Sequence, residues 1–221
     1  MVESIGIKLV DGALHIEGFP DAVKAIQLSS AKAKRLADLA LHRSDLSFAL
    51  QSLEALNSGT VSDHVRESLW RSAIVHLYKC FQDSASRSSL AAAAVYSSAP
   101  PEAMLNFVHF RHLRNKHLVH DENSYAQCLP AAILNDGTKD HKIERILAST
   151  VLAGTLGQDE YSNVHRLIDR AIDWVDRAFD ALCAELTAEL ESIAYADLLV
   201  MPDLTVDTPK LEDLARPRKR P

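Results

Sequence analysis

One short segment of the chain gathers the residue types that hold phosphate and move protons. Positions 114–120 carry an arginine, an asparagine, a lysine and two histidines. Around them, residues 103–120 include four of the ten histidines and no Asp or Glu, although the chain carries 30 acidic residues in 221. A guanidinium binds phosphate, and an imidazole exchanges protons near neutral pH. The segment therefore predicts an anionic substrate.

We expect this segment to be helical, because Pro100 and Pro101 are followed by apolar residues at helical spacing. Four basic side chains would share an arc of about 80° on a regular helix: His109, His112, Lys116 and His120. Arg114 would point about 120° away from His120. Two arrangements would bring this pair together. Either the helix loosens just before His120, or a twofold axis places the basic stripe against its copy in a second subunit.

Such a cleft suits RNA cleavage by attack of the ribose 2′-hydroxyl on the adjacent phosphate. One histidine takes the proton of the 2′-hydroxyl, a second proton donor serves the leaving 5′-oxygen, and arginine stabilises the charge on phosphorus. DNA is excluded as a substrate, because the nucleophile belongs to ribose. The expected products are a 2′,3′-cyclic phosphate and a 5′-hydroxyl, and the reaction needs neither a metal nor another cofactor.

Arg114 and His120, with Asn115 directly after the arginine, resemble the R-x(4–6)-H motif of the HEPN superfamily. The resemblance implies an α-helical bundle that dimerises, and a metal-independent endoribonuclease of a toxin–antitoxin, phage-defence or stress system. It also implies Arg114 and His120 as the catalytic pair and Asn115 as the polar residue that orders the site. RNA, a second copy of the chain, and an antitoxin or effector protein are the implied partners.

Further basic residues are expected to bind substrate around this pair: Arg111, His112, Lys116 and His117. Arg111 and His117 also repeat the same spacing, so they form an alternative register of the motif. A HEPN-like module that binds RNA or a protein without cutting it is the alternative function. A metal site is disfavoured, because Lys116 lies in the histidine stripe and would repel a cation.

The remaining sequence predicts the elements that position this helix. Apolar residues at helical spacing predict helices over about 21–56, 62–82 and 159–199. Alternating apolar residues around Asp11 and Gly12 predict a hairpin, and two apolar runs predict a second hairpin at about 127–152. The predicted fold is mainly α: a HEPN-like helical bundle with two long helices, an N-terminal β-hairpin and a β-hairpin inserted before the last long helix.

Three parts of the chain are predicted. They are an N-terminal hairpin (1–20), a HEPN-like helical domain (21–200) and a disordered basic tail (201–221). No apolar run reaches the length of a membrane span, and the first residues lack the pattern of a secretion signal. Three dispersed cysteines predict no disulfide framework. We therefore expect a cytoplasmic protein whose net charge of −6 confines RNA contacts to a local surface.

Overall fold

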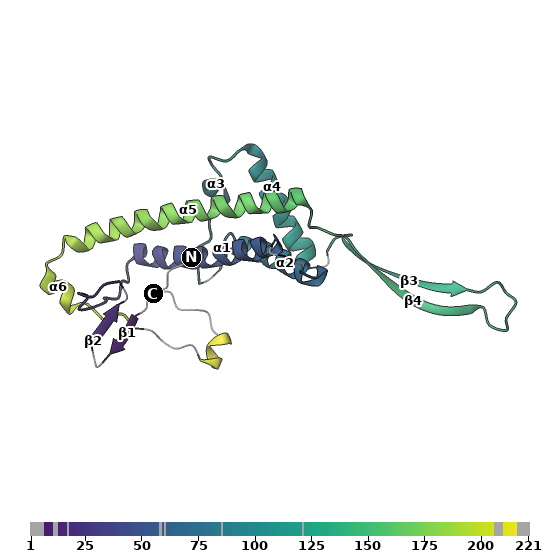
Figure 1. The fold of residues 1–221 in the computed structure, drawn as a ribbon, viewed down its shortest axis with the longest axis horizontal. Helices are drawn as coiled ribbons and strands as arrows, with labels where there is room; N and C mark the ends of the chain where they lie inside the picture. The colour runs from purple at the N-terminus through teal and green to yellow at the C-terminus, as the bar shows by residue number, and fades with distance from the viewer. Residues whose placement is uncertain are drawn as a thin grey trace.

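The computed structural model is mainly helical, with two small antiparallel sheets. The described residues are 7–10, 13–16, 18–57, 59, 61–84, 86–120, 122–205 and 210–215. Three helices form the body of the molecule, α1 (Ala31–Glu54), α2 (Asp63–Lys79) and α5 (Gln158–Glu191), and α5 runs alongside α1 (Figure 1). Among the described residues, no helix is both long enough and apolar enough to cross a membrane.

Shorter elements complete the fold. The other helices are α3 (Ala92–Val95), α4 (Pro101–Leu113) and α6 (Tyr195–Val200). Single helical turns cover Ala55–Asn57, Arg114–Leu118 and Leu211–Ala215. The strands are β1 (Ile7–Val10), β2 (Ala13–Ile16), β3 (Ala126–Leu134) and β4 (Ile143–Leu152).

The hydrophobic core lies where α1, α2 and α5 meet, and α4 contributes one of its largest side chains. Fully buried apolar residues come from all four helices: Leu46, Leu53, Trp70, Ile74, Leu77, Phe110, Val164, Ile168 and Val175. The Trp70 ring meets Phe110 edge-on at 6.0 Å, and its Nε1 donates a hydrogen bond to Thr155 Oγ1 at 3.0 Å. Phe110 therefore anchors α4 only four residues before Arg114.

The first long helix begins ten residues later than its apolar pattern predicts. Ser30 caps α1, because its Oγ accepts a hydrogen bond from the backbone N–H of Ala33 at 3.1 Å. The preceding segment is extended and pairs with the chain after α6, through hydrogen bonds such as Gln27 N to the Pro202 carbonyl oxygen (2.8 Å). This long-range pairing overrides the local helical preference, so the predicted helix over 21–30 is wrong.

The last long helix is broken where the sequence predicts continuity to residue 199. α5 ends at Glu191, and the Ser192 hydroxyl donates back to the Glu189 carbonyl oxygen at 2.6 Å. A serine side chain that binds the carbonyl one turn back competes with the helical ladder. The chain then forms the short α6 and turns toward the segment before α1, where Lys24 donates to the carbonyl oxygens of Leu199 and Met201.

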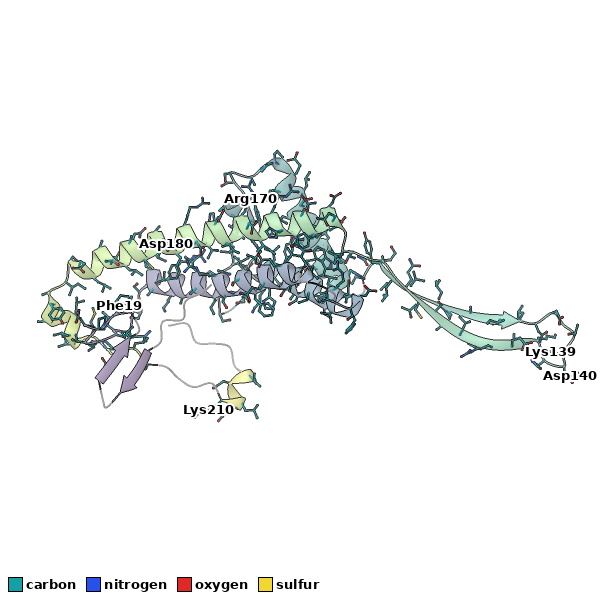
Figure 2. The ribbon with its side chains drawn as sticks, in the orientation of Figure 1. Phe19, Lys139, Asp140, Arg170, Asp180 and Lys210 are labelled. Carbon is teal, nitrogen blue, oxygen red and sulfur yellow. The ribbon has the colours of Figure 1, made fainter. Side chains whose placement is uncertain are left out.

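Both predicted hairpins are confirmed as antiparallel strand pairs, β1 with β2 and β3 with β4. The predicted turn at Asp11 and Gly12 and the basic end of the tail, 216–221, lie outside the described residues. β3 and β4 form an arm that projects away from the helical body (Figure 1). Figure 2 shows its side chains standing clear of the helices, with Lys139 and Asp140 at the far tip.

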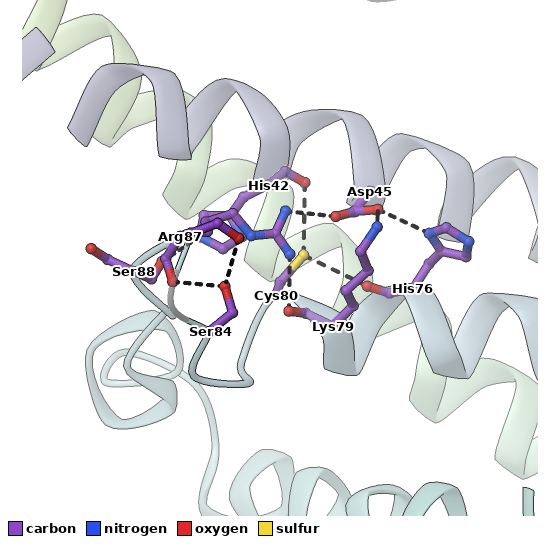
Figure 3. A network of polar contacts seen from close by, with 9 residues as sticks. His42, Asp45, His76, Lys79, Cys80, Ser84, Arg87 and Ser88 are labelled. Atoms are coloured by element: carbon purple, nitrogen blue, oxygen red, sulfur yellow. Dashed lines mark hydrogen bonds and ion pairs between the residues drawn. The ribbon is translucent and has the colours of Figure 1, made fainter. Parts of the chain in front are cut away.

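A buried carboxylate ties α1 to α2 and to the loop that follows α2 (Figure 3). Asp45 is 8 % exposed and bonds with His76 Nδ1 (3.0 Å), Lys79 Nζ (2.8 Å) and Arg87 Nη1 (2.7 Å). Burial by itself would raise the pKa of Asp45, but the hydrogen bonds from Lys79, Arg87 and His76 hold that pKa below its usual value. The three partners make the buried charge tolerable and fix the loop at residues 84–88 against α1.

His42 lies one turn before Asp45 and is fully buried. Its Nε2 is 2.9 Å from the carbonyl oxygen of Ser88, an acceptor, so this nitrogen carries the ring proton. Its Nδ1 has no hydrogen-bond partner. Burial lowers the pKa of His42 to about 4, and the positive charge of Arg87 adds to this effect.

We predict that the fold loses stability as the pH falls from 6.5 toward 4. The unfolded His42 ring binds a proton near pH 6.5, whereas the folded ring does so only near pH 4, so the unfolded state holds more protons between these values. The expected loss in the free energy of unfolding is about 3 kcal/mol, measured by urea denaturation at stepped pH. His42→Leu should remove this part of the pH dependence; an identical slope in both proteins would contradict it.

Candidate functional site

The predicted motif lies at the end of α4, where the helix changes its geometry. After Leu113 the chain widens into one π-helical turn, Arg114–Leu118, and the Val119 N–H donates to the Arg114 carbonyl oxygen five residues back at 3.0 Å. The sequence left two arrangements open, a helix that loosens just before His120 or a twofold axis, and within the single chain the helix does loosen there. Such π turns are frequent at functional sites.

Arg114 is held in place by two amide oxygens. Its Nη1 donates to Asn115 Oδ1 at 2.9 Å and its Nη2 donates to Gln82 Oε1 at 3.0 Å. The third guanidinium nitrogen, Nε, is buried without a hydrogen-bond partner. Gln82 belongs to the loop after α2, so this contact joins the motif to the helical body. Neither partner is charged, and the guanidinium therefore keeps its positive charge available to an anion.

His120 lies beyond the π turn and is exposed to solvent. Two contacts between Lys116 and Glu122 bracket this histidine. The Glu122 N–H donates to the Lys116 carbonyl oxygen at 2.9 Å, and the two side chains form an ion pair. The hydrogen bond from Lys116 lowers the pKa of Glu122, and the nearby His120 contributes to that shift. A protonated His120 would thus have a carboxylate close by.

His117 takes the opposite position, because it is only 5 % exposed. Its ring packs against Tyr125 with 5.5 Å between ring centroids, and its Nδ1 is buried without a partner. Arg111 is exposed at the end of α4. The alternative register therefore pairs an exposed arginine with a buried histidine. Arg114 and His120 are the better pair, because His120 is the one that substrate can reach.

The basic stripe predicted on α4 faces solvent along its whole length. Its members are all exposed: His109, His112, Lys116 and His120. Arg114 and Asn115 are partly buried beside it. Neither a hydrogen bond nor an ion pair joins Arg114 to His120 within the single chain, although both residues are described. The pair is thus brought to one end of α4, but the two side chains do not touch.

A groove of about 490 Å³ opens next to Arg114, between α1 and the loop after α2. Gln82, which holds Arg114, also lines this groove together with Lys79 and Arg87. A larger cavity of about 580 Å³ lies elsewhere, between α4 and the start of α5, and contains no residue of the motif. The groove also contains the carboxylates of Asp45 and Asp83, and Gln82 is its link to Arg114.

Sequence reasoning missed Gln82, Tyr125 and the Asp45 network. Gln82 and Tyr125 gave no local signal, because each meets the motif only through the folding of a distant loop. The network did leave a signal on α1: Asp38, His42 and Asp45 recur at intervals of four and three residues on the same buried face as Leu39 and Leu46. Polar residues on an apolar face of a helix indicate a buried network that needs partners.

The arrangement offers one fixed cation and one free imidazole at the end of a helix that carries few carboxylates. Arg114 can bind a phosphate oxygen, and His120 can exchange a proton with a group that approaches from solvent. Within the described part of the chain, no cluster of three or more His, Cys, Asp or Glu side chains is placed to hold a metal ion.

No family model matches the chain, and no match is found among curated proteins or solved structures. Function is therefore inferred from these residues and their geometry.

Proposed function

We propose that the chain is a HEPN-like, metal-independent endoribonuclease that acts as a homodimer in defence or stress. The observation that carries the proposal is the anchoring of Arg114 together with the exposure of His120. Arg114 is anchored by the neutral oxygens of Gln82 and Asn115, and His120 stands exposed beyond the π turn. An anchored cation together with an accessible imidazole is the combination that phosphoryl transfer without a metal requires.

In the proposed reaction, His120 accepts the proton of the ribose 2′-hydroxyl. The 2′-oxygen then bonds to phosphorus, the bond from phosphorus to the 5′-oxygen breaks, and that oxygen takes a proton from a second acid in the cleft. Arg114 stabilises the charge that develops on the phosphoryl oxygens. The exposed Arg111, Lys116 and His112 bind the neighbouring phosphates. The buried His117 supports the turn instead of contacting RNA.

We predict that Arg114→Ala and His120→Ala each reduce RNA cleavage by at least a hundredfold while the melting temperature stays near that of wild type. Arg114 is partly buried at a loop and His120 is exposed, so neither side chain supports the core. Arg177→Ala and His64→Ala, exposed positions on other helices, are matched controls that should cut normally. Full activity in either motif variant would remove that residue from the mechanism.

Gln82 is proposed as a positioning residue that acts through Arg114. Gln82→Ala removes one of two acceptors from the guanidinium, so kcat/KM for an oligoribonucleotide should fall about tenfold. Gln82→Glu keeps an acceptor oxygen in the same place but adds a negative charge that competes with phosphate for the guanidinium, so it should not restore the activity. A wild-type kcat/KM in Gln82→Ala would show that Arg114 does not depend on this contact.

Cleavage should persist in excess EDTA, because no step is assigned to a metal ion. The measurement is the initial rate on a labelled oligoribonucleotide before and after exhaustive chelation, with Arg114→Ala as the background control. Activity that disappears with EDTA and returns with Mg²⁺ would overturn the mechanism. Binding of RNA without cleavage under every condition would favour the non-catalytic module instead.

A further inference from the structure

The β3–β4 arm is an apolar ribbon with solvent on both faces. It comprises residues 126–152, which is 27 residues, and no charged residue occurs in 126–133 or 146–152. Seven of its large apolar side chains are 45–70 % exposed: Leu129, Ile133, Leu134, Ile143, Ile146, Val151 and Leu152. Together they present on the order of 400 Å² of apolar side-chain surface to water.

Such an arm is not stable by itself. An isolated two-stranded hairpin is marginal in water, and three or more strands are needed for independent stability. Strand alternation divides these side chains between the two faces of the ribbon, and exposed apolar surface of this extent is often functional. The arm therefore needs additional strands or a covering surface.

The two free edges of the arm differ in their capacity to pair. The Ala153 N–H donates to the Tyr125 carbonyl oxygen at 2.8 Å, which makes this the first hydrogen-bonded pair of the ladder. Hydrogen-bonded pairs alternate with non-bonded pairs in antiparallel strands, so Pro130 and Ala148 form a non-bonded pair. The nitrogen of Pro130 therefore faces outward and interrupts the free edge of β3. Proline at this position protects an edge against further pairing.

The free edge of β4 has no such protection between residues 146 and 152, because the bulge at Glu144 lies closer to the tip. By the same alternation, the outward N–H and C=O groups belong to Ile146, Ala148, Thr150 and Leu152. None of these is proline or glycine, and no charge lies among them. One protected edge and one open edge on the same ribbon indicate that pairing is directed to β4.

We propose that β4 pairs antiparallel with β4 of a second copy of this chain, with the twofold axis at Ala148. The register is self-complementary: Ile146 faces Thr150, Leu147 faces Ser149, and Arg145 faces Val151, so no like charges are opposed. Ala148 with its copy and the two Ile146–Thr150 pairs supply about six backbone hydrogen bonds.

A second copy is the occupant that fits the size and chemistry of this surface. A sheet of four strands, in the order β3, β4, β4, β3, passes the threshold for independent stability. The β4 edge is apolar and uncharged, so it is unfavourable to leave it unpaired. A second copy of the chain is always present to pair with it, because each copy has the same edge.

The same register places the arm of one copy near the motif of the other, and the functional meaning of this placement rests on the proposed function. Continued past the strand ends, the register brings the loop around Lys142 of one copy near Ala153 and Gly154 of the other. The partner of Ala153, Tyr125, packs against His117. The tip of one arm, which carries two lysines and two aspartates, thus approaches the motif of the second copy.

The test compares two proline substitutions at equivalent places on the two edges. Ala148→Pro removes the outward backbone N–H at the proposed axis. Ala132→Pro removes an outward backbone N–H from the β3 edge, which Pro130 already interrupts. Both positions lie in non-bonded pairs, so the bonds between β3 and β4 stay intact. Sedimentation equilibrium should give wild type and Ala132→Pro about twice the chain mass of 24.4 kDa, and Ala148→Pro about the chain mass. Far-ultraviolet circular dichroism verifies that the helices remain.

Ile146→Lys provides a second disruption through the side chain, because a lysine on an edge strand opposes pairing. It should also give a monomer. A monomeric wild type at tens of micromolar would overturn the proposal, as would a dimer that survives both Ala148→Pro and Ile146→Lys. Arg114→Ala should remain a dimer, so a failure of the nuclease assignment would leave these masses unchanged and is distinguishable from a failure of the arm pairing.

Discussion

A carboxylate buried among helices destabilises a fold by several kcal/mol unless cations meet it, and Asp45 satisfies this constraint with Lys79, Arg87 and His76. These contacts hold the end of α2 and the loop after it against α1. Gln82 lies in that stretch and binds Arg114. Phe110 anchors the other side of the motif in the core next to Trp70. The position of Arg114 thus follows from a charge network and a packed ring, both of which lie outside the motif.

Local patterns were sufficient to predict the mainly helical architecture, the helix that carries the motif and both hairpins, because apolar periodicity reports directly on burial. They failed where distant segments meet. Residues 25–27 are extended because they pair with 202–204, and α5 stops where Ser192 bonds back to the helix. The accessibility of the two motif histidines was equally unpredictable, because Tyr125 covers His117 only after the arm has placed it there.

The π turn explains how one short segment serves two roles. It ends the part of α4 that packs in the core, and it releases the following residues from the helical ladder. His117 turns inward and stabilises the base of the arm, while His120 faces solvent. The arm that begins a few residues later is the element proposed to bring in a second copy. The residues proposed for catalysis and the strand proposed for assembly thus lie in adjacent parts of the chain.

The most direct test of the account is cleavage of an oligoribonucleotide whose ribose at the mapped cut site carries a 2′-deoxy substitution, assayed in EDTA beside the all-ribose substrate. The proposed mechanism predicts cleavage of the all-ribose substrate to a 2′,3′-cyclic phosphate and no cleavage at the substituted position, since the nucleophile is missing. Cleavage at the 2′-deoxy position would show that water or the protein attacks phosphorus, and it would contradict the roles assigned to Arg114 and His120.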